Sequence, residues 1–291
     1  MTSSISIVSP SSPLTEEQIA PTKSAILYLA GLGLEVKHDR ALFSLDIKSP
    51  EYRAKQFMDE YLSQESDILL ASRGGSSAIE ILELLDYEKL FQAKPKPILG
   101  YSDLTTLALA LNNYAQKHSY KAIPFYHAPM LFECASWANA TKDSFELGIE
   151  KIRNKIQNQN FEMHFDDLSA GLKAMLQASN SCILQEFNTP ILGGNLSIII
   201  SLIGTGYLPS FKDSILFIEE CNEPLYKVER MLWQMHYAKL FHGVKELWIG
   251  ISEEAEIPMD LLMNFADIYG FRILRDLPIG HGKLNFVTKL F

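Results

Sequence analysis

The feature that most constrains the fold of this chain is the alternation of short apolar runs with longer segments of helical periodicity. Residues 4–8, 67–72 and 98–99 are short apolar runs, whereas residues 76–90 and 103–117 carry apolar side chains near helical spacing. This alternation is typical of βαβ units, in which helices join parallel strands. The sequence therefore predicts an α/β fold whose N-terminal half contains a parallel sheet.

Two loops of this predicted sheet follow a strand and precede a helix. Residues 73–75 (Arg-Gly-Gly) form the first, and residues 100–103 (Gly-Tyr-Ser-Asp) form the second. Consecutive units of a parallel sheet present such loops at the same edge. We therefore expect the two loops to be neighbours.

The same alternation resumes in the C-terminal part of the chain. Residues 193–195 (Gly-Gly-Asn) are expected to form a turn that opens a helix. Further elements are predicted as strands at residues 215–218, 246–251 and 271–274 and as helices at residues 223–241 and 259–268.

A polar and charged stretch at about residues 142–160 separates the two regions. We therefore predict an N-terminal domain over residues 1–141, a connecting segment over residues 142–188 and a smaller C-terminal domain over residues 189–291.

Composition and charge exclude several classes of function. The chain has 291 residues, of which 47% are hydrophobic, so it can form a substantial core. It carries 35 acidic and only 26 basic residues, which argues against a surface that binds nucleic acid or anionic lipid. A small soluble substrate is the better expectation.

Cysteine usage and the apolar segments predict a cytoplasmic protein. Cys134, Cys182 and Cys221 are scattered and odd in number, which indicates reduced thiols rather than a disulfide framework. The first 14 residues do not resemble a secretory signal, and Gly193 and Gly194 interrupt the apolar stretch 191–208, which disfavours a membrane span.

No motif in the sequence indicates a metal or a nucleotide cofactor. The seven histidines form no HExxH pattern and no close cluster with cysteine. No glycine-rich loop matches a phosphate-binding or dinucleotide-binding fingerprint. A reaction that needs no cofactor is therefore expected.

Ser102 is the first candidate for chemistry, because it lies where an apolar strand turns into a helix. Such a turn exposes a hydroxyl at the sheet edge, and the helix start aims backbone N–H groups at the same place. The simpler interpretation is that Ser102 or Asp103 caps the helix. The local pattern alone favours capping, since a second glycine of the common nucleophile motif is missing.

His281 and two acidic residues are the other candidates. His281 lies between Gly280 and Gly282 after a predicted strand, although a single histidine is more often structural or solvated than catalytic. Glu219 and Glu220 end the strand predicted at residues 215–218, at the functional edge of a parallel sheet. Both faces of that strand are apolar, so the pattern does not decide which acid faces a site.

Several short motifs occur together in one order: Ser-Arg-Gly-Gly at 72–75, Gly-Tyr-Ser-Asp-Leu-Thr at 100–105, Gly-Gly-Asn-Leu-Ser at 193–197 and Phe-Ile-Glu-Glu at 217–220. Because it carries these motifs in this order, the chain resembles the LD-carboxypeptidase family, which includes the microcin C immunity peptidases. The resemblance extends from Ile7 to Gly280-His281. It implies a flavodoxin-like N-terminal domain, a smaller β/α C-terminal domain and, commonly, a homodimer.

The resemblance also implies a role for each candidate residue. Ser102 would be the nucleophile, His281 the base and Glu219 the acid that orients the base. The backbone N–H groups of Gly75 and Asp103 would form the oxyanion hole. The chain departs from the family pattern after His127, where Ala128 stands in place of the usual glycine.

The function implied by the resemblance is that of a serine peptidase that removes the C-terminal D-alanine of a cytoplasmic muropeptide tetrapeptide during peptidoglycan recycling. One alternative within the same chemistry is an immunity peptidase that hydrolyses peptidyl or aminoacyl adenylate analogues. Another is a catalytically silent protein that binds peptides in the same cleft.

Overall fold

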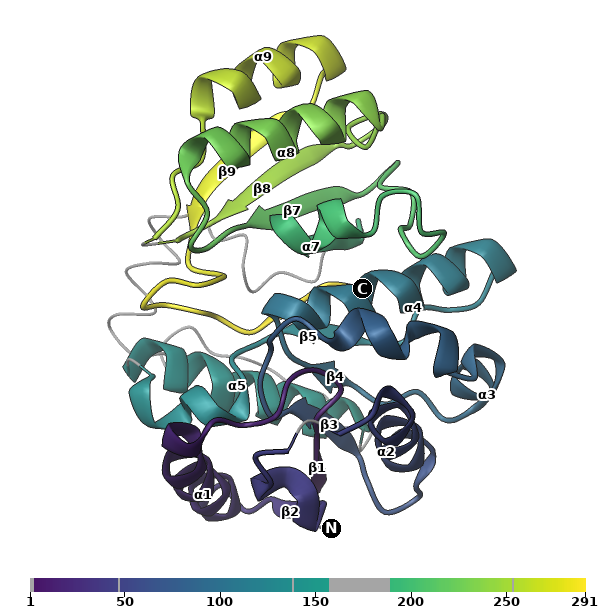
Figure 1. The fold of residues 1–291 in the computed structure, drawn as a ribbon, viewed down its shortest axis with the longest axis vertical. Helices are drawn as coiled ribbons and strands as arrows, with labels where there is room; N and C mark the ends of the chain where they lie inside the picture. Colours follow the sequence, from purple (N-terminus) through teal and green to yellow (C-terminus); the bar gives the residue numbers. More distant parts are fainter. Residues whose placement is uncertain (1–2, 47, 138, 157–188, 253) are drawn as a thin grey trace.

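The structure is a computed structural model that describes residues 3–46, 48–137, 139–156, 189–252 and 254–291. It contains a six-stranded sheet in the order β10-β5-β4-β3-β1-β2 and a four-stranded sheet in the order β6-β7-β8-β9. The two sheets belong to two domains that are stacked along the long axis of the molecule, with the chain's purple-to-teal half below and its green-to-yellow part above (Figure 1). The expected α/β fold with a smaller second domain is confirmed.

The first sheet is parallel except for its last strand. Its strands are β1 (Ser4–Val8), β2 (Glu35–His38), β3 (Ile68–Ala71), β4 (Ile98–Leu99), β5 (Phe125–His127) and β10 (Thr288–Lys289). Strand β10, near the end of the chain, pairs antiparallel with β5. The C-terminal segment thus crosses back to the first domain and joins its sheet.

Helices cover both faces of the first sheet. Apolar side chains that alternate along β3 divide between two cores: Leu69 and Ala71 pack with one, Ile68 and Leu70 with the other. Such alternation is expected of a strand buried on both faces. The first core includes α2 (Pro50–Leu62), α3 (Tyr87–Gln92) and α4 (Thr105–His118), and the second includes α1 (Glu16–Gly31) and α5 (Asn139–Ile156).

Helix α5 includes the start of the predicted connecting segment. Phe145, Ile149 and Ile152 on α5 are buried against the first sheet, so this part of the chain packs with the N-terminal domain. The apolar spacing of 3 and 4 residues among them is that of one helix face. The rest of the segment, residues 157–188, lies outside the described residues.

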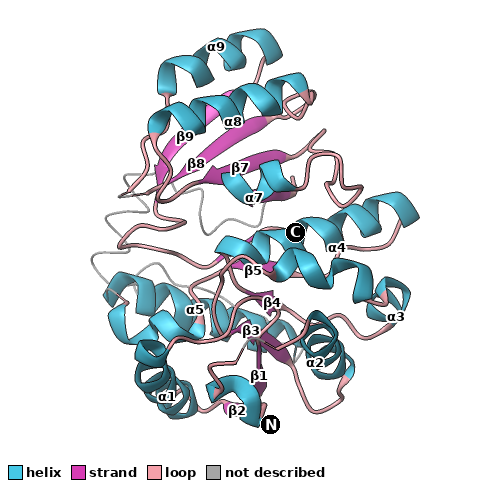
Figure 2. Ribbon diagram, viewed as in Figure 1, coloured by secondary structure: helices cyan, strands magenta, loops and turns pink. Residues whose placement is uncertain are grey.

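The second sheet is parallel throughout. Its strands are β6 (Ile191–Asn195), β7 (Ile215–Glu219), β8 (Glu246–Gly250) and β9 (Arg272–Leu277), and its helices are α7 (Leu196–Ser201), α8 (Leu225–Tyr237) and α9 (Met259–Tyr269). Figure 2 shows α8 and α9 together on the outer side of this sheet, away from the first domain.

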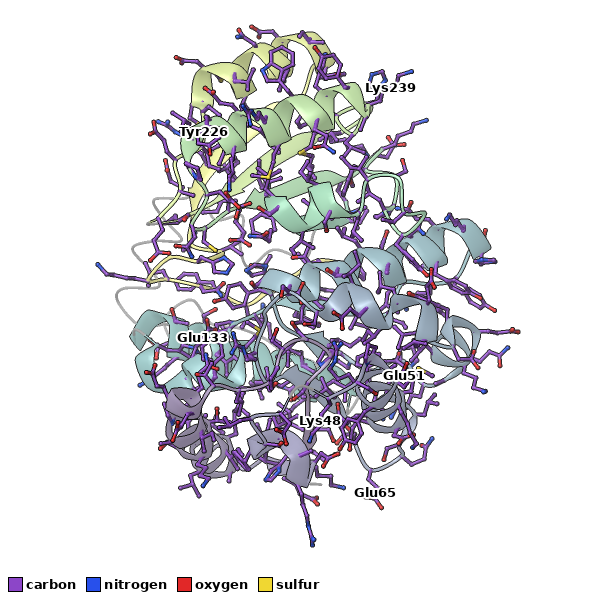
Figure 3. All side chains as sticks on the ribbon, viewed as in Figure 1. Lys48, Glu51, Glu65, Glu133, Tyr226 and Lys239 are labelled. Atoms are coloured by element: carbon purple, nitrogen blue, oxygen red, sulfur yellow. The ribbon has the colours of Figure 1, made fainter. Side chains whose placement is uncertain are left out.

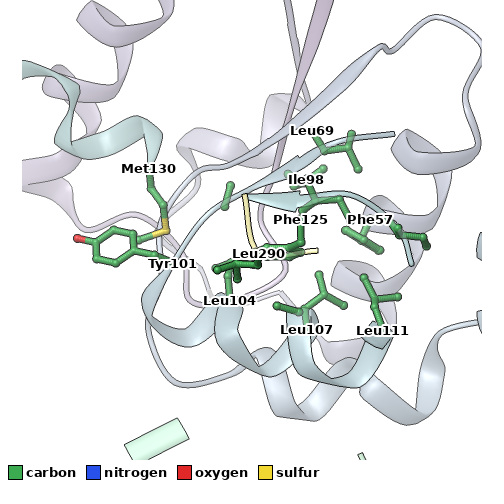
Figure 4. Packing of buried hydrophobic residues seen from close by; sticks show 14 of the residues in the cluster. Phe57, Leu69, Ile98, Tyr101, Leu104, Leu107, Leu111, Phe125, Met130 and Leu290 are labelled. Carbon is green, nitrogen blue, oxygen red and sulfur yellow. The ribbon is translucent and has the colours of Figure 1, made fainter. Parts of the chain in front are cut away.

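The inner face of the second sheet packs on the first domain. On β7, Leu216 and Ile218 contact the core under α8 and α9, whereas Ile215 and Phe217 join the core of α2 and α4. Figure 4 shows part of that shared core, in which Leu290 from the C-terminal segment lies among Leu104, Leu107 and Phe125. One continuous apolar core therefore fixes the two domains to each other.

Two predicted elements are wrong in detail. Residues 193–195 do not form a turn but end strand β6, and a Cβ atom on Gly193 would lie 1.8 Å from the carbonyl oxygen of Phe217. Both Gly193 and Gly194 have positive φ, 136° and 141°. These glycines therefore allow close approach of neighbouring backbone rather than a reversal of the chain.

The helix predicted over residues 76–90 is interrupted. A 3-10 helix, η2 (Ala78–Leu84), is followed by the separate helix α3 (Tyr87–Gln92). The break lies at Asp86, whose carboxylate accepts the backbone N–H of Lys89 and caps α3. Asp at a helix start competes with continuation of a preceding helix, which explains the break.

Candidate active site

Ser102 lies at a strained turn between β4 and α4. Its φ of 58° falls in the left-handed region, which few residues other than glycine adopt. Tyr101 before it is extended, and the 3-10 helix η3 (Ser102–Leu104) leads directly into α4. The predicted strand-to-helix turn is present, and Ser102 itself is partly exposed there while Tyr101 and Asp103 are buried.

The Arg-Gly-Gly loop lies against this turn, as expected from the parallel sheet. A Cβ atom on Gly74 would be 3.1 Å from the Oγ of Ser102. Gly75 has a φ of 140°, and a Cβ atom there would lie only 2.1 Å from the Oγ of Ser12. Any larger residue at position 75 would displace the loop, so glycine is needed at this position.

The side chain of Asp103 holds the surrounding loops together. Its Oδ2 accepts hydrogen bonds from the Ser11 Oγ at 2.5 Å and from the backbone N–H of Ala78 at 2.8 Å. These donors belong to the loop after β1 and the start of η2. Asp103 therefore positions the loops on either side of Ser102 through its carboxylate, and its side chain does not cap α4.

His281 and Glu219 are hydrogen-bonded to each other. The Nδ1 of His281 lies 2.5 Å from the Oε2 of Glu219. Since an ionised carboxylate only accepts, the Nδ1–H is the donor and the Nε2 is left for other partners. The side chain of Glu219 is fully buried and that of His281 is 19% exposed, so the pair lies at the border of the core.

Two glycines make room for this carboxylate. Cβ atoms on Gly250 and Gly280 would each lie 3.0 Å from the Cβ of Glu219. The loop that carries His281 is anchored by Asn285, whose Oδ1 accepts the N–H of Gly280 and whose own N–H is donated to Thr141. The His281 loop is thus attached to the N-terminal domain beside α5.

The side chain of the adjacent Glu220 makes hydrogen bonds that stabilise the fold and does not contact His281. It points to the other face of β7 and accepts hydrogen bonds from the Asn195 Nδ2, from the N–H and Oγ of Ser197, and from the N–H of Cys221. These bonds tie β7 to the start of α7. Glu219 shares its face with Ile215 and Phe217, the face that packs on the first domain, and this explains which acid reaches His281.

The ring of Tyr101 connects the two parts of the site. Its centroid lies 4.8 Å from that of His281 and 5.2 Å from that of His127. Because Ser102 follows Tyr101 directly, this ring contact places His281 next to the loop that carries Ser102. The hydroxyl of Tyr101 donates a hydrogen bond to the Oε1 of Glu133.

The two histidines at this site have opposite electrostatic environments. Burial disfavours the charged form of His281, but hydrogen bonds with Cys221 and Glu219 and their charges outweigh it and raise the pKa of His281 to about 10. Burial lowers the pKa of His127 to about 4. His127 is only 1% exposed, so it is a neutral buried ring with no access to a substrate.

Sequence reasoning missed three residues of this site: Tyr101, Glu133 and Cys221. Tyr101 was identified only as part of the Ser102 loop, and Glu133 lies in a short 3-10 helix, η4 (Leu131–Ser136), that has no motif. Cys221 follows the two acids and contacts His281, although its sequence position suggests only a scattered thiol. The signal for Glu133 was its position just after a strand of the first sheet, at the functional edge.

Comparison with known families assigns both domains. The family model described as the LD-carboxypeptidase N-terminal domain matches residues 5–122, and that described as the LD-carboxypeptidase C-terminal domain matches residues 188–290. The chain belongs to the LD-carboxypeptidase family. The resemblance stated from the motifs is thereby confirmed.

Individual relatives can be aligned with nearly the whole length of this LD-carboxypeptidase family member. The murein tetrapeptide carboxypeptidase of Pseudomonas aeruginosa is 23% identical over 293 residues, which cover 97% of this chain and 89% of that protein. Among solved structures, muramoyltetrapeptide carboxypeptidase from Oxalobacter formigenes has a TM-score of 0.69 at 22% identity and covers 99% of this chain and 92% of its own.

A second solved structure is MccF in complex with glutamyl sulfamoyl guanosine. It has a TM-score of 0.78 at 18% identity and covers 99% of this chain and 91% of its own. At these identities the two structures support the two-domain fold. Within the described residues of this family member, no group of three or more His, Cys, Asp or Glu side chains is placed to hold a metal ion, and no helix is both long and apolar enough to cross a membrane.

Proposed function

We propose that this protein is a serine-type LD-carboxypeptidase in which Ser102, His281 and Glu219 are nucleophile, base and orienting acid. The observation that carries this proposal is the Nδ1–H hydrogen bond from His281 to the buried carboxylate of Glu219. In this proposal the other ring nitrogen, Nε2, is the proton acceptor, and the contact of the ring with Tyr101 in the loop of Ser102 supports this assignment. A serine, a histidine and a carboxylate in this order form the hydrogen-bonded unit used in serine peptidases.

In the proposed reaction, the Nε2 of His281 takes the proton of the Ser102 hydroxyl as the serine oxygen attacks the amide carbonyl. The N–H groups of Gly75 and Asp103 stabilise the negative charge that forms on the carbonyl oxygen. His281 then gives its proton to the leaving amine, and an acyl-enzyme remains on Ser102. Water, activated by His281, releases the acyl group and regenerates the serine.

The raised pKa of His281 has a consequence for this mechanism. The ring must be neutral before it can accept the proton of Ser102, so the free enzyme must first lose a proton from His281. Once Ser102 has given up its proton, the negative carboxylate of Glu219 stabilises the imidazolium that forms. The same pair therefore favours the charged intermediate and limits activity at low pH.

The substrate we propose is a muropeptide tetrapeptide in the cytoplasm, from which the enzyme releases the C-terminal D-alanine. Membership of the LD-carboxypeptidase family supports the bond type, and the name of the Pseudomonas aeruginosa relative supports the substrate class. The test is incubation of the tetrapeptide with the enzyme and with Ser102→Ala, followed by mass spectrometry. Loss of one alanine with the parent alone supports the proposal, and an unchanged tetrapeptide contradicts it.

The likeness to MccF supports one alternative, an immunity peptidase that cleaves aminoacyl or peptidyl adenylate analogues. Both substrates would use the same triad, so the choice depends on the binding pocket. Parallel measurement of kcat/KM for the tetrapeptide and for an aminoacyl sulfamoyl nucleoside distinguishes the two. If Ser102→Ala and the parent both bind the tetrapeptide and neither cleaves either substrate, the protein is a peptide-binding relative without catalysis.

We also propose a homodimer, the assembly implied by the resemblance to this family. Light scattering coupled to size-exclusion chromatography tests it directly. A mass near twice the 32.8 kDa of one chain supports the dimer, and a mass near that of one chain contradicts it.

A further inference from the structure

We propose that Tyr101, held by Glu133, is a positioning residue that sets the orientation of the His281 ring. This inference rests on the proposed function, since it assigns Tyr101 a part in the proton transfer that His281 performs. It adds an aromatic contact with the imidazole to the hydrogen bonds that Glu219 and Cys221 make with it.

The first observation is the contact between the rings. The planes of Tyr101 and His281 are inclined at 49° with a centroid separation of 4.8 Å, within the range of a packed aromatic pair. Hydrogen bonds with Glu219 and Cys221 hold the imidazole at its edge, and edge contacts alone still allow the plane of the ring to tilt. The additional contact with the Tyr101 ring restricts this tilt.

The second observation is that Tyr101 is itself fixed. Its ring is 5% exposed and also contacts His127, which is buried and packs edge-to-face on Phe217. Figure 4 shows Tyr101 beside Met130, with its hydroxyl directed away from the other labelled apolar residues of the cluster. The ring thus lies between the two domains, and its polar end points out of the core.

The third observation is the partner of that hydroxyl. Tyr101 donates to the Oε1 of Glu133, and the Oε2 of Glu133 accepts the backbone N–H of Met130 at 3.0 Å. Figure 3 labels Glu133 on the side of the N-terminal domain that carries α5. Burial and the neighbouring Glu133 raise the pKa of Tyr101 well above its ordinary value, so the phenol keeps its proton and remains the donor.

This arrangement favours positioning over proton relay. The Tyr101 hydroxyl is used by Glu133, and the tyrosine meets His281 through its ring. Removing the hydroxyl alone should therefore loosen the ring without deleting it. Because small errors in the placement of a catalytic group reduce the rate of the chemical step, the effect should appear in kcat rather than in KM.

The experiment compares Tyr101→Phe with Tyr28→Phe. Tyr28 donates the same kind of hydrogen bond, to Glu146 at 2.5 Å, but on helices α1 and α5 of the first domain. Two measurements are made: kcat and KM on the tetrapeptide, and the low-field proton resonance of the His281 Nδ1–H, which is identified by its loss in His281→Ala. The resonance reports the His281–Glu219 bond whether or not the protein turns over a substrate.

For Tyr101→Phe we expect a fall in kcat of about 10- to 100-fold with KM nearly unchanged, together with a shift or broadening of the resonance. Tyr28→Phe should alter neither. Glu133→Ala should reproduce Tyr101→Phe, and the double variant should lose no more than either single one, because the two residues act as one unit. Glu133→Ala also provides the test if Tyr101→Phe does not fold.

Two results would overturn the inference. One is an unchanged resonance and unchanged kcat in folded Tyr101→Phe. The other is a fall in kcat with an unchanged resonance, which would mean that Tyr101 acts on the substrate and not through His281. If the parent cleaves no tetrapeptide but the resonance shifts as expected in Tyr101→Phe and not in Tyr28→Phe, the proposed substrate is wrong and the positioning of His281 by Tyr101 stands.

Discussion

The two sheets of this molecule are covered in different ways. The first sheet has helices on both faces, so each of its two cores is built largely from the N-terminal domain. The second sheet has α8 and α9 on one face and the first domain on the other (Figure 1). Apart from strand β10, the first sheet is therefore a self-contained layer, whereas the second depends on the first to cover its inner face.

This difference explains why the candidate site lies between the domains. Ser102 is fixed at the edge of the self-contained sheet, where the β4–α4 turn is supported by Asp103. Glu219 leaves the dependent sheet on the face turned toward the first domain, and His281 lies on a loop anchored to Thr141. The Glu219–His281 pair therefore lies next to the loop of Ser102, because the second sheet needs the first to cover its inner face.

The largest effect should come from the residue on the self-contained sheet. Ser102→Ala should lower kcat by about 10⁶-fold, the effect of losing the nucleophile of a serine peptidase, and should change the free energy of unfolding by less than about 0.5 kcal/mol, because the side chain is partly exposed. Single-turnover assays and urea denaturation measure the two quantities. Substantial hydrolysis by the folded variant would remove Ser102 as nucleophile.

Much of the first sheet could be predicted from the sequence, because its strands are short apolar runs that end in small or polar residues. The strand at residues 4–8 was predicted with the bounds that β1 has. Strand β2 (Glu35–His38) was missed because it lies at the edge and carries polar residues with little burial. Strand β10 could not be predicted, since two residues pair with β5 only after the chain has returned from the second domain.

The second prediction compares the two adjacent acids of β7, which lie on opposite faces of the dependent sheet. Glu219→Gln should lower kcat by about 10³- to 10⁴-fold, because an amide cannot stabilise the imidazolium and disturbs the tautomer of His281. Glu220→Gln should reduce kcat far less. It should instead lower the free energy of unfolding by about 1–3 kcal/mol, since Glu220 accepts four hydrogen bonds in a buried place.

Steady-state kinetics and thermal melting of both variants measure these effects. The contrast itself is the control, because the substitutions are the same and the residues are neighbours. A collapse of activity in Glu220→Gln with near-parental activity in Glu219→Gln would show that the roles of the two faces are reversed.

The site was less predictable than the fold, and β7 shows the reason. Alternation along the strand places Glu219 and Glu220 on opposite faces, but both faces are apolar, and the sequence pattern does not say which apolar face meets the other domain. The same limit applies to Tyr101 and Glu133, which come from different units of the first sheet. Their pairing depends on tertiary packing, which leaves no periodic pattern in the local sequence.

The third prediction concerns pH and tests whether Glu219, on the dependent sheet, raises the pKa of His281. His281 must be neutral to act as a base, and its pKa is raised above the ordinary 6.5. We therefore expect kcat/KM to rise with pH and to reach half of its maximum well above pH 6.5. In Glu219→Gln the midpoint should move to lower pH, because the negative charge that favours imidazolium is gone.

A pH–rate profile of the parent and of Glu219→Gln measures this shift. Among the described residues, the groups near His281 that titrate or carry charge include Glu219, Cys221, Tyr101, Glu133 and His127. Cys221→Ser separates the contribution of the thiol from that of the carboxylate. A midpoint at or below pH 6.5 in the parent would contradict the raised pKa of His281.

The smallest expected effect is that of metal chelators, which should leave kcat/KM unchanged. The reason lies in how the ionisable side chains at the domain border are already used. Glu219 binds His281, Glu133 binds Tyr101 and the N–H of Met130, and His127 is buried. A serine nucleophile activated by a histidine needs no Lewis acid.

The measurement is turnover of the tetrapeptide after extended dialysis against EDTA, with and without added Zn²⁺, and with Ser102→Ala as the control for background hydrolysis. Equal rates in all parent samples would mean that catalysis by Ser102, His281 and Glu219 does not require a metal ion. A loss of activity with EDTA that Zn²⁺ restores would mean that a metal ion takes part in catalysis, and the serine mechanism would have to be abandoned.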